Sequence, residues 1–201
     1  MHAIERELKF QLTEYEFEKL VKFSADKESP LRQTNYYFDT PSFCLEKKGV
    51  TLRIRNENNA WLLCLKSKLR HQSSITTSLE LQTTVTEAVY LNCKNQPMRV
   101  FEYLDPEAKD IIFQTIADEP LIMLGHIANI RYHMPISNQY VIELDHSQFP
   151  GDVEMFEAEV EGIVNSTETD YVIHYLSQVG ISIKYSSKSK YKRFVESLLG
   201  R

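Results

Sequence analysis

The sequence predicts an α+β fold built on an antiparallel sheet of about eight strands, and three observations support this prediction. Stretches of alternating apolar and polar residues recur along the chain, and most are joined by short turns. Four or five stretches with helical spacing lie between them. The polar faces of several strands carry charges of one sign, such as Arg53 and Arg55 or Glu157 and Glu159. Eight strands are enough to close a barrel, so these faces could line its interior.

The strand expected at residues 4–10 shows this pattern first. Because side chains alternate across a strand, Glu5, Glu7 and Lys9 share one face, and apolar residues such as Leu8 share the other. Turn-forming residues at 56–59 make a hairpin of the flanking strands, and Pro135 lies in a second hairpin turn. The remaining strands are expected at 33–39, 50–55, 60–68, 74–85, 127–134, 139–145 and 155–162.

The helices are marked by their caps. Thr13 and Glu16 form a capping box before a helix that ends near residue 24. Thr86 begins a second helix, and Gly180 is the C-cap of a later one. The other helices are expected at 105–117, 167–179 and 186–199.

Composition limits the class of protein. The chain has 201 residues, 42% hydrophobic and 25% charged, which fits a single folded domain at 1–201. Its net charge of −5 gives no general attraction to nucleic acid. The three cysteines form no metal-binding spacing, and no signal peptide or apolar run of the ~20 residues that cross a bilayer is present. We therefore expect a cytoplasmic protein with no membrane partner.

Two sets of charged residues could carry chemistry. Carboxylates two apart on a strand share a face and can converge with those of a neighbouring strand on a hard cation, Mg²⁺ or Mn²⁺ rather than Zn²⁺. Arginine and lysine supply the groups that bind phosphate oxygens. Taken singly, each residue is more simply a solvated surface charge. The acidic set comprises Glu5, Glu7, Asp145, Glu157 and Glu159, and the basic set comprises Lys9, Arg53, Arg55, Lys66, Arg131, Lys190 and Arg193.

Some of these positions carry more information than others. Lys66 ends a strand that is apolar on both faces, where a solvated lysine is less expected. The basic residues that open the helix at 186–199 are unfavourable near a helix N-terminus unless an anion compensates them.

In this order along the chain, the two sets resemble the CYTH superfamily, the triphosphate tunnel metalloenzymes, and most of all its uncharacterised bacterial branch. The resemblance covers roughly residues 4 to 194. It rests on Glu5-x-Glu7-x-Lys9, Tyr37-Phe38-Asp39-Thr40, Leu52-Arg53-Ile54-Arg55, Leu65-Lys66, Arg131, Leu144-Asp145, Glu157-x-Glu159 and Lys190-x-x-Arg193-Phe194.

The resemblance implies an eight-stranded antiparallel barrel that forms a tunnel, with helices packed outside and apolar residues such as Ile4, Leu8 and Leu52 beneath them. It implies that the acidic set holds one or two Mg²⁺ or Mn²⁺ ions and that the basic set binds the phosphates. Glu5, Glu7 and Lys9 are the implied catalytic residues. The sequence is compatible with either a monomer or a homodimer.

The sequence also departs from the family pattern. Asn129 stands where a threonine is common, two residues before Arg131, and Met155 stands where an aspartate is expected. Glu80 is a further candidate for an inward carboxylate, but its register is uncertain and its simpler interpretation is a solvated strand residue. Tyr37 and Asp39 are expected to stabilise a turn rather than to touch substrate.

Three functions follow from the resemblance. The first is a metal-dependent hydrolase of small triphosphates, with inorganic tripolyphosphate ahead of thiamine triphosphate and nucleoside triphosphates because no adenine or aromatic pocket is evident. Trp61, the only tryptophan, is expected on the strand face opposite Lys66. The alternatives are a class IV-type adenylate cyclase and a non-catalytic sensor that binds polyphosphate or nucleotide.

Overall fold

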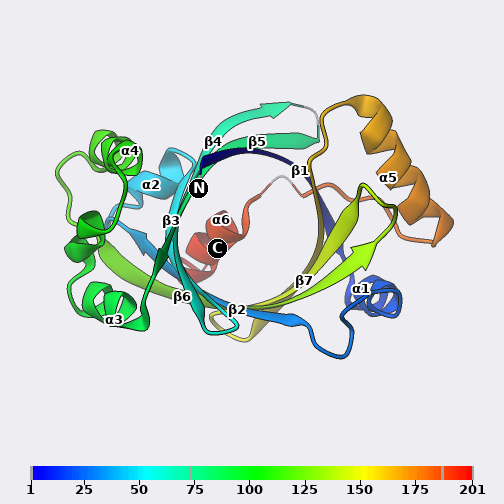
Figure 1. Ribbon diagram of the computed structural model, residues 1–201, viewed down its shortest axis with the longest axis horizontal. Coiled ribbons are helices and arrows are strands. Elements are labelled where there is room, and N and C mark those ends of the chain that lie inside the picture. The colour runs from blue at the N-terminus through cyan, green and yellow to red at the C-terminus, as the bar shows by residue number, and fades with distance from the viewer. Residues whose placement is uncertain (1, 73, 187, 201) are drawn as a thin grey trace.

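Eight antiparallel strands close into a barrel in the computed structural model, which describes residues 2–72, 74–186 and 188–200 (Figure 1). The order around the barrel is β1-β5-β4-β3-β2-β6-β7-β8. The strands are β1 (His2–Leu12), β2 (Leu31–Asp39), β3 (Val50–Glu57), β4 (Ala60–Gln72), β5 (Ile75–Val85), β6 (Ile122–Pro135), β7 (Val141–Phe149) and β8 (Val153–Glu161). The predicted α+β barrel is therefore confirmed.

Helices cover the outside of the barrel on two sides (Figure 1). On one side, α1 (Glu14–Val21) and α5 (Ser166–Gln178) pack on β1, β7 and β8, where Leu8 and Leu144 are fully buried. On the other side, α3 (Glu87–Asn95), η1 (Pro97–Glu102) and α4 (Pro106–Ile116) pack on β3 and β4, where Leu52 and Leu65 are fully buried. The apolar cores thus lie outside the strands, which leaves the inner faces free for polar residues.

Two further helices are α2 (Cys44–Lys47), whose Leu45 packs in the outer core beside β3, and α6 (Lys190–Leu198), which lies at one end of the barrel. Phe194 of α6 joins a small cluster with Tyr37 and Ile127, which come from strand faces that point inward. Gly125 makes this approach possible, because a Cβ atom there would lie 3.2 Å from Phe194 Cζ. Figure 1 shows α6 within the outline of the barrel. We call this the helix end of the tunnel.

The structure corrects some expected boundaries. The strand β6 begins at Ile122 rather than at residue 127, and α2 and η1 are short helices that the sequence pattern did not predict. The last helix begins at Lys190 rather than at residue 186, because the preceding chain pairs with β1: Gln11 N donates to Lys184 O at 2.8 Å. Ile4 is 58% exposed, so this outward residue has no helix over it.

Candidate active site

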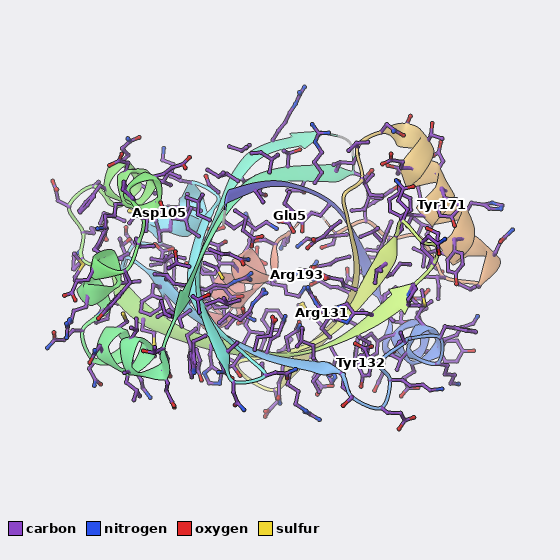
Figure 2. All side chains as sticks on the ribbon, in the orientation of Figure 1. Glu5, Asp105, Arg131, Tyr132, Tyr171 and Arg193 are labelled. Carbon is purple, nitrogen blue, oxygen red and sulfur yellow. The ribbon has the colours of Figure 1, made fainter. Side chains whose placement is uncertain are left out.

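A cavity of about 610 Å³ occupies the inside of the barrel. Most of the predicted charged residues line it. Glu157 and Arg193 are buried beside it and pair with each other through Arg193 Nη1 and Glu157 Oε1 at 2.9 Å. Figure 2 shows Glu5, Arg131 and Arg193 inside the outline of the barrel. The predicted residues that line the cavity are Glu5, Glu7, Lys9, Arg53, Arg55, Lys66, Arg131, Asp145, Glu159 and Lys190.

Strand pairing explains why these residues meet. Lys9 of β1 pairs with Glu159 of β8, and Glu157 of β8 pairs with Asp145 of β7. Arg131 of β6 in turn pairs with Asp145. Because partners in an antiparallel ladder project to the same face, four adjacent strands place acids and bases side by side in the interior.

Asp145 is the most enclosed carboxylate of the site. Arg131 donates to it from Nε at 2.7 Å and from Nη2 at 2.6 Å, and Lys190 Nζ lies 2.6 Å from its Oδ2. Burial alone would raise the pKa of Asp145, but the charges of Arg131 and Lys190 outweigh it and hold this pKa well below its usual range. Asp145 is therefore ionised inside the barrel.

Glu159 lies at the centre of a second set of contacts. Lys190 Nζ is 2.6 Å from its Oε1, Lys9 Nζ is 3.0 Å away, and Arg131 Nη2 is 3.0 Å from its Oε2. These three cations overcome the effect of burial and hold the pKa of Glu159 well below its usual range. The same contacts raise the pKa of Lys9 despite its burial, so both groups stay charged.

The carboxylates of β1 pair with Lys66. Lys66 Nζ forms ion pairs with Glu5 and, at 3.2 Å, with Glu7 Oε2, while Lys9 Nζ lies 3.3 Å from Glu7. Glu5 also shares a hydrogen bond with Glu161 of β8, and burial together with this bond raises the pKa of Glu161 to about 8. The first strand thus contributes acids that already touch the basic set.

The two arginines of β3 are held more loosely. Arg53 Nη2 lies 3.7 Å from Glu80 Oε1, and Arg55 donates from Nε to Asn35 Oδ1 at 3.0 Å. Burial and the neighbouring charges of Arg53 and Arg131 lower the pKa of Arg55. Two adjacent, buried guanidiniums of this kind favour an anion between them.

Several inward residues were not among the predicted set. Glu57, Glu143 and Glu161 line the cavity, and so does Glu80, which corrects its simpler interpretation as a solvated residue. The signal was the alternation itself, since Glu161 continues the series of Glu157 and Glu159. Glu57 likewise continues the series of Arg53 and Arg55, but its change of sign concealed it.

The departures from the family pattern have structural roles here. Asn129 is buried, donates from Nδ2 to Asp145 Oδ1 at 2.9 Å and accepts from Ser147 Oγ at 2.7 Å. It thereby orients the Asp145 carboxylate. Met155 Sδ lies 3.4 Å from Arg193 Nη1.

Of the two residues expected to stabilise a turn, Asp39 does so, whereas Tyr37 lies on the cavity wall. Asp39 accepts hydrogen bonds from the backbone nitrogens of Leu45 at 2.8 Å and Glu46 at 3.0 Å, so it caps α2. Tyr37 stacks on Tyr191 of α6 at 5.0 Å between ring centroids. Trp61 stacks on Tyr90 on the outside of the barrel, which confirms that it faces away from Lys66.

The contact between α6 and Asp39 gives a prediction. Tyr191 Oη donates to Asp39 Oδ2 at 2.5 Å in a buried setting, and burial with the charge of Asp39 raises the pKa of Tyr191. Tyr191→Phe is expected to lower the free energy of unfolding by about 1–2 kcal/mol, because a buried charged acceptor loses a donor. Urea denaturation measures this, with the exposed Tyr15→Phe as the control. Equal stability of the two variants would contradict the anchoring role.

A histidine and an aspartate meet at the opposite end of the tunnel. His133 Nδ1 lies 2.7 Å from Asp26 Oδ2, and the backbone nitrogen of His133 donates to Asp26 Oδ1 at 2.8 Å. Partial burial opposes ionisation of Asp26, but these hydrogen bonds lower its pKa. The contact joins the loop after α1 to the edge of β6.

This contact should show in the pH dependence of stability. A carboxyl whose pKa is lowered by folding stabilises the fold above its ordinary pKa of 3.8, and the contribution is lost as the pH falls below that value. Asp26→Asn is therefore expected to be less stable than the wild type at pH 7, with a difference that narrows at about pH 3. Urea denaturation at both pH values tests this, and a constant difference would contradict it.

The donor set fits hard divalent cations. It consists of carboxylates without cysteine, and the buried Glu157 Oε2 accepts no hydrogen bond, although Lys190 Nζ lies 3.2 Å away. Within residues 2–72, 74–186 and 188–200, no three acidic, histidine or cysteine side chains form a ready metal cluster. The carboxylates form ion pairs with lysine and arginine side chains instead. Binding of a metal cation therefore requires these ion pairs to rearrange.

The structure is thus a closed barrel whose inner face carries interleaved acids and bases. The chain belongs to the CYTH domain family, whose model matches residues 3–195. A curated relative, the candidate triphosphatase YjbK of Bacillus subtilis, is 42% identical over 64 residues. That alignment covers 31% of this chain and 34% of YjbK, so it spans about a third of the relative's length.

Solved structures show the same fold. One is the candidate adenylyl cyclase HpAC1 from Hippeastrum, a protein with a dominant triphosphatase activity. Its sequence is 21% identical to this chain, and the two structures superpose with a TM-score of 0.81 over 96% of each chain. A candidate adenylate cyclase from Bacillus halodurans is 25% identical with a TM-score of 0.79, covering 96% of this chain and 98% of the other. In the described part of this chain, every helix is too short or too polar to cross a membrane.

Proposed function

We propose that this protein is a hydrolase of small triphosphates that depends on Mg²⁺ or Mn²⁺. Its preferred substrate in this proposal is inorganic tripolyphosphate. Membership of the CYTH domain family and the candidate triphosphatase among its relatives support this reaction class. One observation carries the proposal. Two loosely held arginines on β3 line the same cavity as a set of ionised carboxylates on β1, β7 and β8.

The charge of the cavity supports the need for metal. Its lining, together with Glu157 and Arg193 buried beside it, carries eleven lysines and arginines and ten carboxylates, which leaves a formal charge of +1. A triphosphate carries roughly −4 to −5, so its charge exceeds that of the site unless divalent cations are present. Two such cations bring the site to about +5, which balances the anion.

The contacts of these residues support the following roles. Glu5, Glu7, Asp145, Glu157 and Glu159 would hold Mg²⁺ or Mn²⁺, which when bound neutralises phosphate oxygens and favours attack by water. Lys9, Arg53, Arg55, Lys66, Arg131, Lys190 and Arg193 would bind phosphate oxygens and stabilise the charge that develops as the bridging P–O bond breaks. Lys9 lies between Glu7 and Glu159, so it contacts two of the proposed metal ligands and would reach a phosphate bound beside them.

The products formed from ATP distinguish this proposal from its alternatives. A triphosphatase is expected to give ADP and phosphate with Mg²⁺ or Mn²⁺, as read by phosphorus NMR. Formation of cAMP and pyrophosphate would instead identify a cyclase, in which the ribose hydroxyl attacks the α-phosphate. Tight binding of tripolyphosphate and ATP without turnover under either metal would identify a sensor. Either of these results would overturn the proposal.

A further inference from the structure

A row of polar side chains crosses the inner wall of the barrel from β3 to β7. Gln33 of β2 lies opposite Glu57 on one side and opposite Asn129 of β6 on the other. Asn129 in turn lies opposite Ser147 of β7. Gln33, Asn129 and Ser147 are 4%, 3% and 0% exposed. Because a buried polar group without a partner is costly, the hydrogen bonds of this row constrain how its side chains are arranged.

Hydrogen bonds join the row from end to end. Ser147 Oγ donates to Asn129 Oδ1 at 2.7 Å, and Asn129 Nδ2 donates to Gln33 Oε1 at 3.0 Å. Gln33 Nε2 donates to Glu57 Oε2 at 2.8 Å. Asn129 Nδ2 also donates to Asp145 Oδ1 at 2.9 Å. Gln33 and Asn129, which we call the amide bridge, thus connect two carboxylates, Glu57 and Asp145.

The two carboxylates fix the orientation of the amide bridge. A carboxylate can only accept hydrogen bonds, so Asn129 must turn its nitrogen atom toward Asp145. Gln33 must likewise turn its nitrogen atom toward Glu57, which leaves its oxygen atom to accept from Asn129. Rotation of either amide group by 180° would set an oxygen atom against a carboxylate and break the bond between the two amides. The amide bridge therefore has one favourable arrangement.

The two carboxylates belong to different halves of the proposed site. Asp145 is a proposed metal ligand, whereas Glu57 Oε2 lies 3.5 Å from Nη1 of Arg55, which is proposed to bind phosphate. Asn129 gives Asp145 a neutral donor, and the lysine and arginine that also contact Asp145 are cations. A divalent cation would repel those cations but not the neutral amide. The hydrogen bond from Asn129 is therefore compatible with a bound metal.

We infer that Gln33 is a positioning residue for both halves of the site, an inference that rests on the proposed function. Through Asn129 it keeps the Asp145 carboxylate in a fixed orientation at the cavity wall. At its other end it holds Glu57, so the contact of Glu57 with Arg55 stays loose. Loss of Gln33 would free Glu57 to close on Arg55 and neutralise the guanidinium. One glutamine thus orients a metal ligand and keeps an arginine available for phosphate.

Gln33→Met tests this inference, because methionine keeps the length of the side chain but lacks the amide group. The dissociation constant of Mn²⁺, measured by calorimetry, is expected to rise about tenfold, and the KM for tripolyphosphate is expected to rise with it. In an Asn129→Ala background the same substitution should change the Mn²⁺ constant less than about twofold, since Gln33 acts on Asp145 through Asn129. Gln148→Met, on the exposed face of β7, is the matched control and should leave the Mn²⁺ constant unchanged.

An exchange of two side chains gives a second test. When Gln33→Glu is combined with Glu57→Gln, the amide at position 57 can donate to the carboxylate at position 33, which still accepts from Asn129. The net charge is unchanged. This combined variant is expected to regain the Mn²⁺ affinity that Gln33→Met loses. It also carries the test if thermal unfolding shows that Gln33→Met does not fold, with a tenfold loss of affinity as the contradicting result.

The outcomes separate a positioning role from a structural one. A lower Tm of Gln33→Met with unchanged Mn²⁺ affinity would show a structural role alone and overturn the inference. An effect of equal size with and without Asn129→Ala would overturn it as well. If the wild type binds Mn²⁺ but releases no phosphate from tripolyphosphate, the proposed function fails, and the Mn²⁺ affinities still decide the role of Gln33. Absence of Mn²⁺ binding to the wild type overturns both.

Discussion

Asp145→Asn is expected to lower the free energy of unfolding by about 3 kcal/mol, because it breaks a buried ion pair and leaves its partners charged. The Asp145 side chain is fully buried and accepts hydrogen bonds from Arg131, Lys190 and Asn129. The asparagine keeps the shape but loses the charge. Its amide would also place a donor against the donors of Arg131 and Lys190. Urea denaturation in the presence of a chelator measures the effect without bound metal.

Asp152→Asn is the matched control for this prediction. Asp152 lies exposed in the turn between β7 and β8 with a φ of 58°, a conformation that asparagine tolerates, so no loss of stability is expected. Equal stability of the two variants would contradict the view that Arg131 and Lys190 depend on Asp145 for their charge balance.

Glu157→Gln is expected to reduce metal-dependent activity by about 10²–10³-fold. Glu157 is 1% exposed, and its Oε2 accepts no hydrogen bond in the described part of the chain. Its partner is Lys190 Nζ at 3.2 Å, which also contacts Asp145 and Glu159, so coordination of a hard cation would add charge compensation that one shared ammonium group does not supply. Mg²⁺ or Mn²⁺ is expected to raise the Tm of the wild type, and this rise should be smaller in the variant, since glutamine keeps the volume but is a poorer ligand.

Glu154→Gln on the same strand is the control for Glu157→Gln. The Glu154 side chain is 48% exposed on the outer face beside His146, so this variant should keep both the activity and the metal-dependent rise in Tm. The combined Glu5→Gln and Glu7→Gln variant should lose activity as Glu157→Gln does. Full metal-dependent activity in that double variant would contradict the assignment of the carboxylates.

Local sequence patterns were sufficient to predict most of the fold. Alternation placed Glu5, Glu7 and Lys9 on one face, and caps such as Thr13 marked helix starts that the structure confirms. The predicted start of α6 was wrong because the true start depends on pairing between β1 and residues 184–186. These segments are more than 170 residues apart in the sequence. The short helix α2 was missed for a related reason, since its cap comes from the side chain of Asp39.

The interior was predicted less completely than the fold. The position of Glu80 depends on its pairing with Lys66 across β4 and β5, which a single strand pattern does not set. Glu161 lies at the end of the strand expected at 155–162, and its place in the site follows from its contact with Glu5 on the neighbouring strand. Register between strands, rather than alternation within them, decides which charges meet.

Phosphate release from tripolyphosphate, ATP and thiamine triphosphate, each with Mg²⁺, with Mn²⁺ and with chelator, tests the central claim most directly. The account predicts release that requires the metal, with tripolyphosphate hydrolysed at the highest kcat/KM, and loss of this release in the combined Glu5→Gln and Glu7→Gln variant. Absence of release from all three substrates under both metals, or release that persists undiminished in chelator, would contradict it.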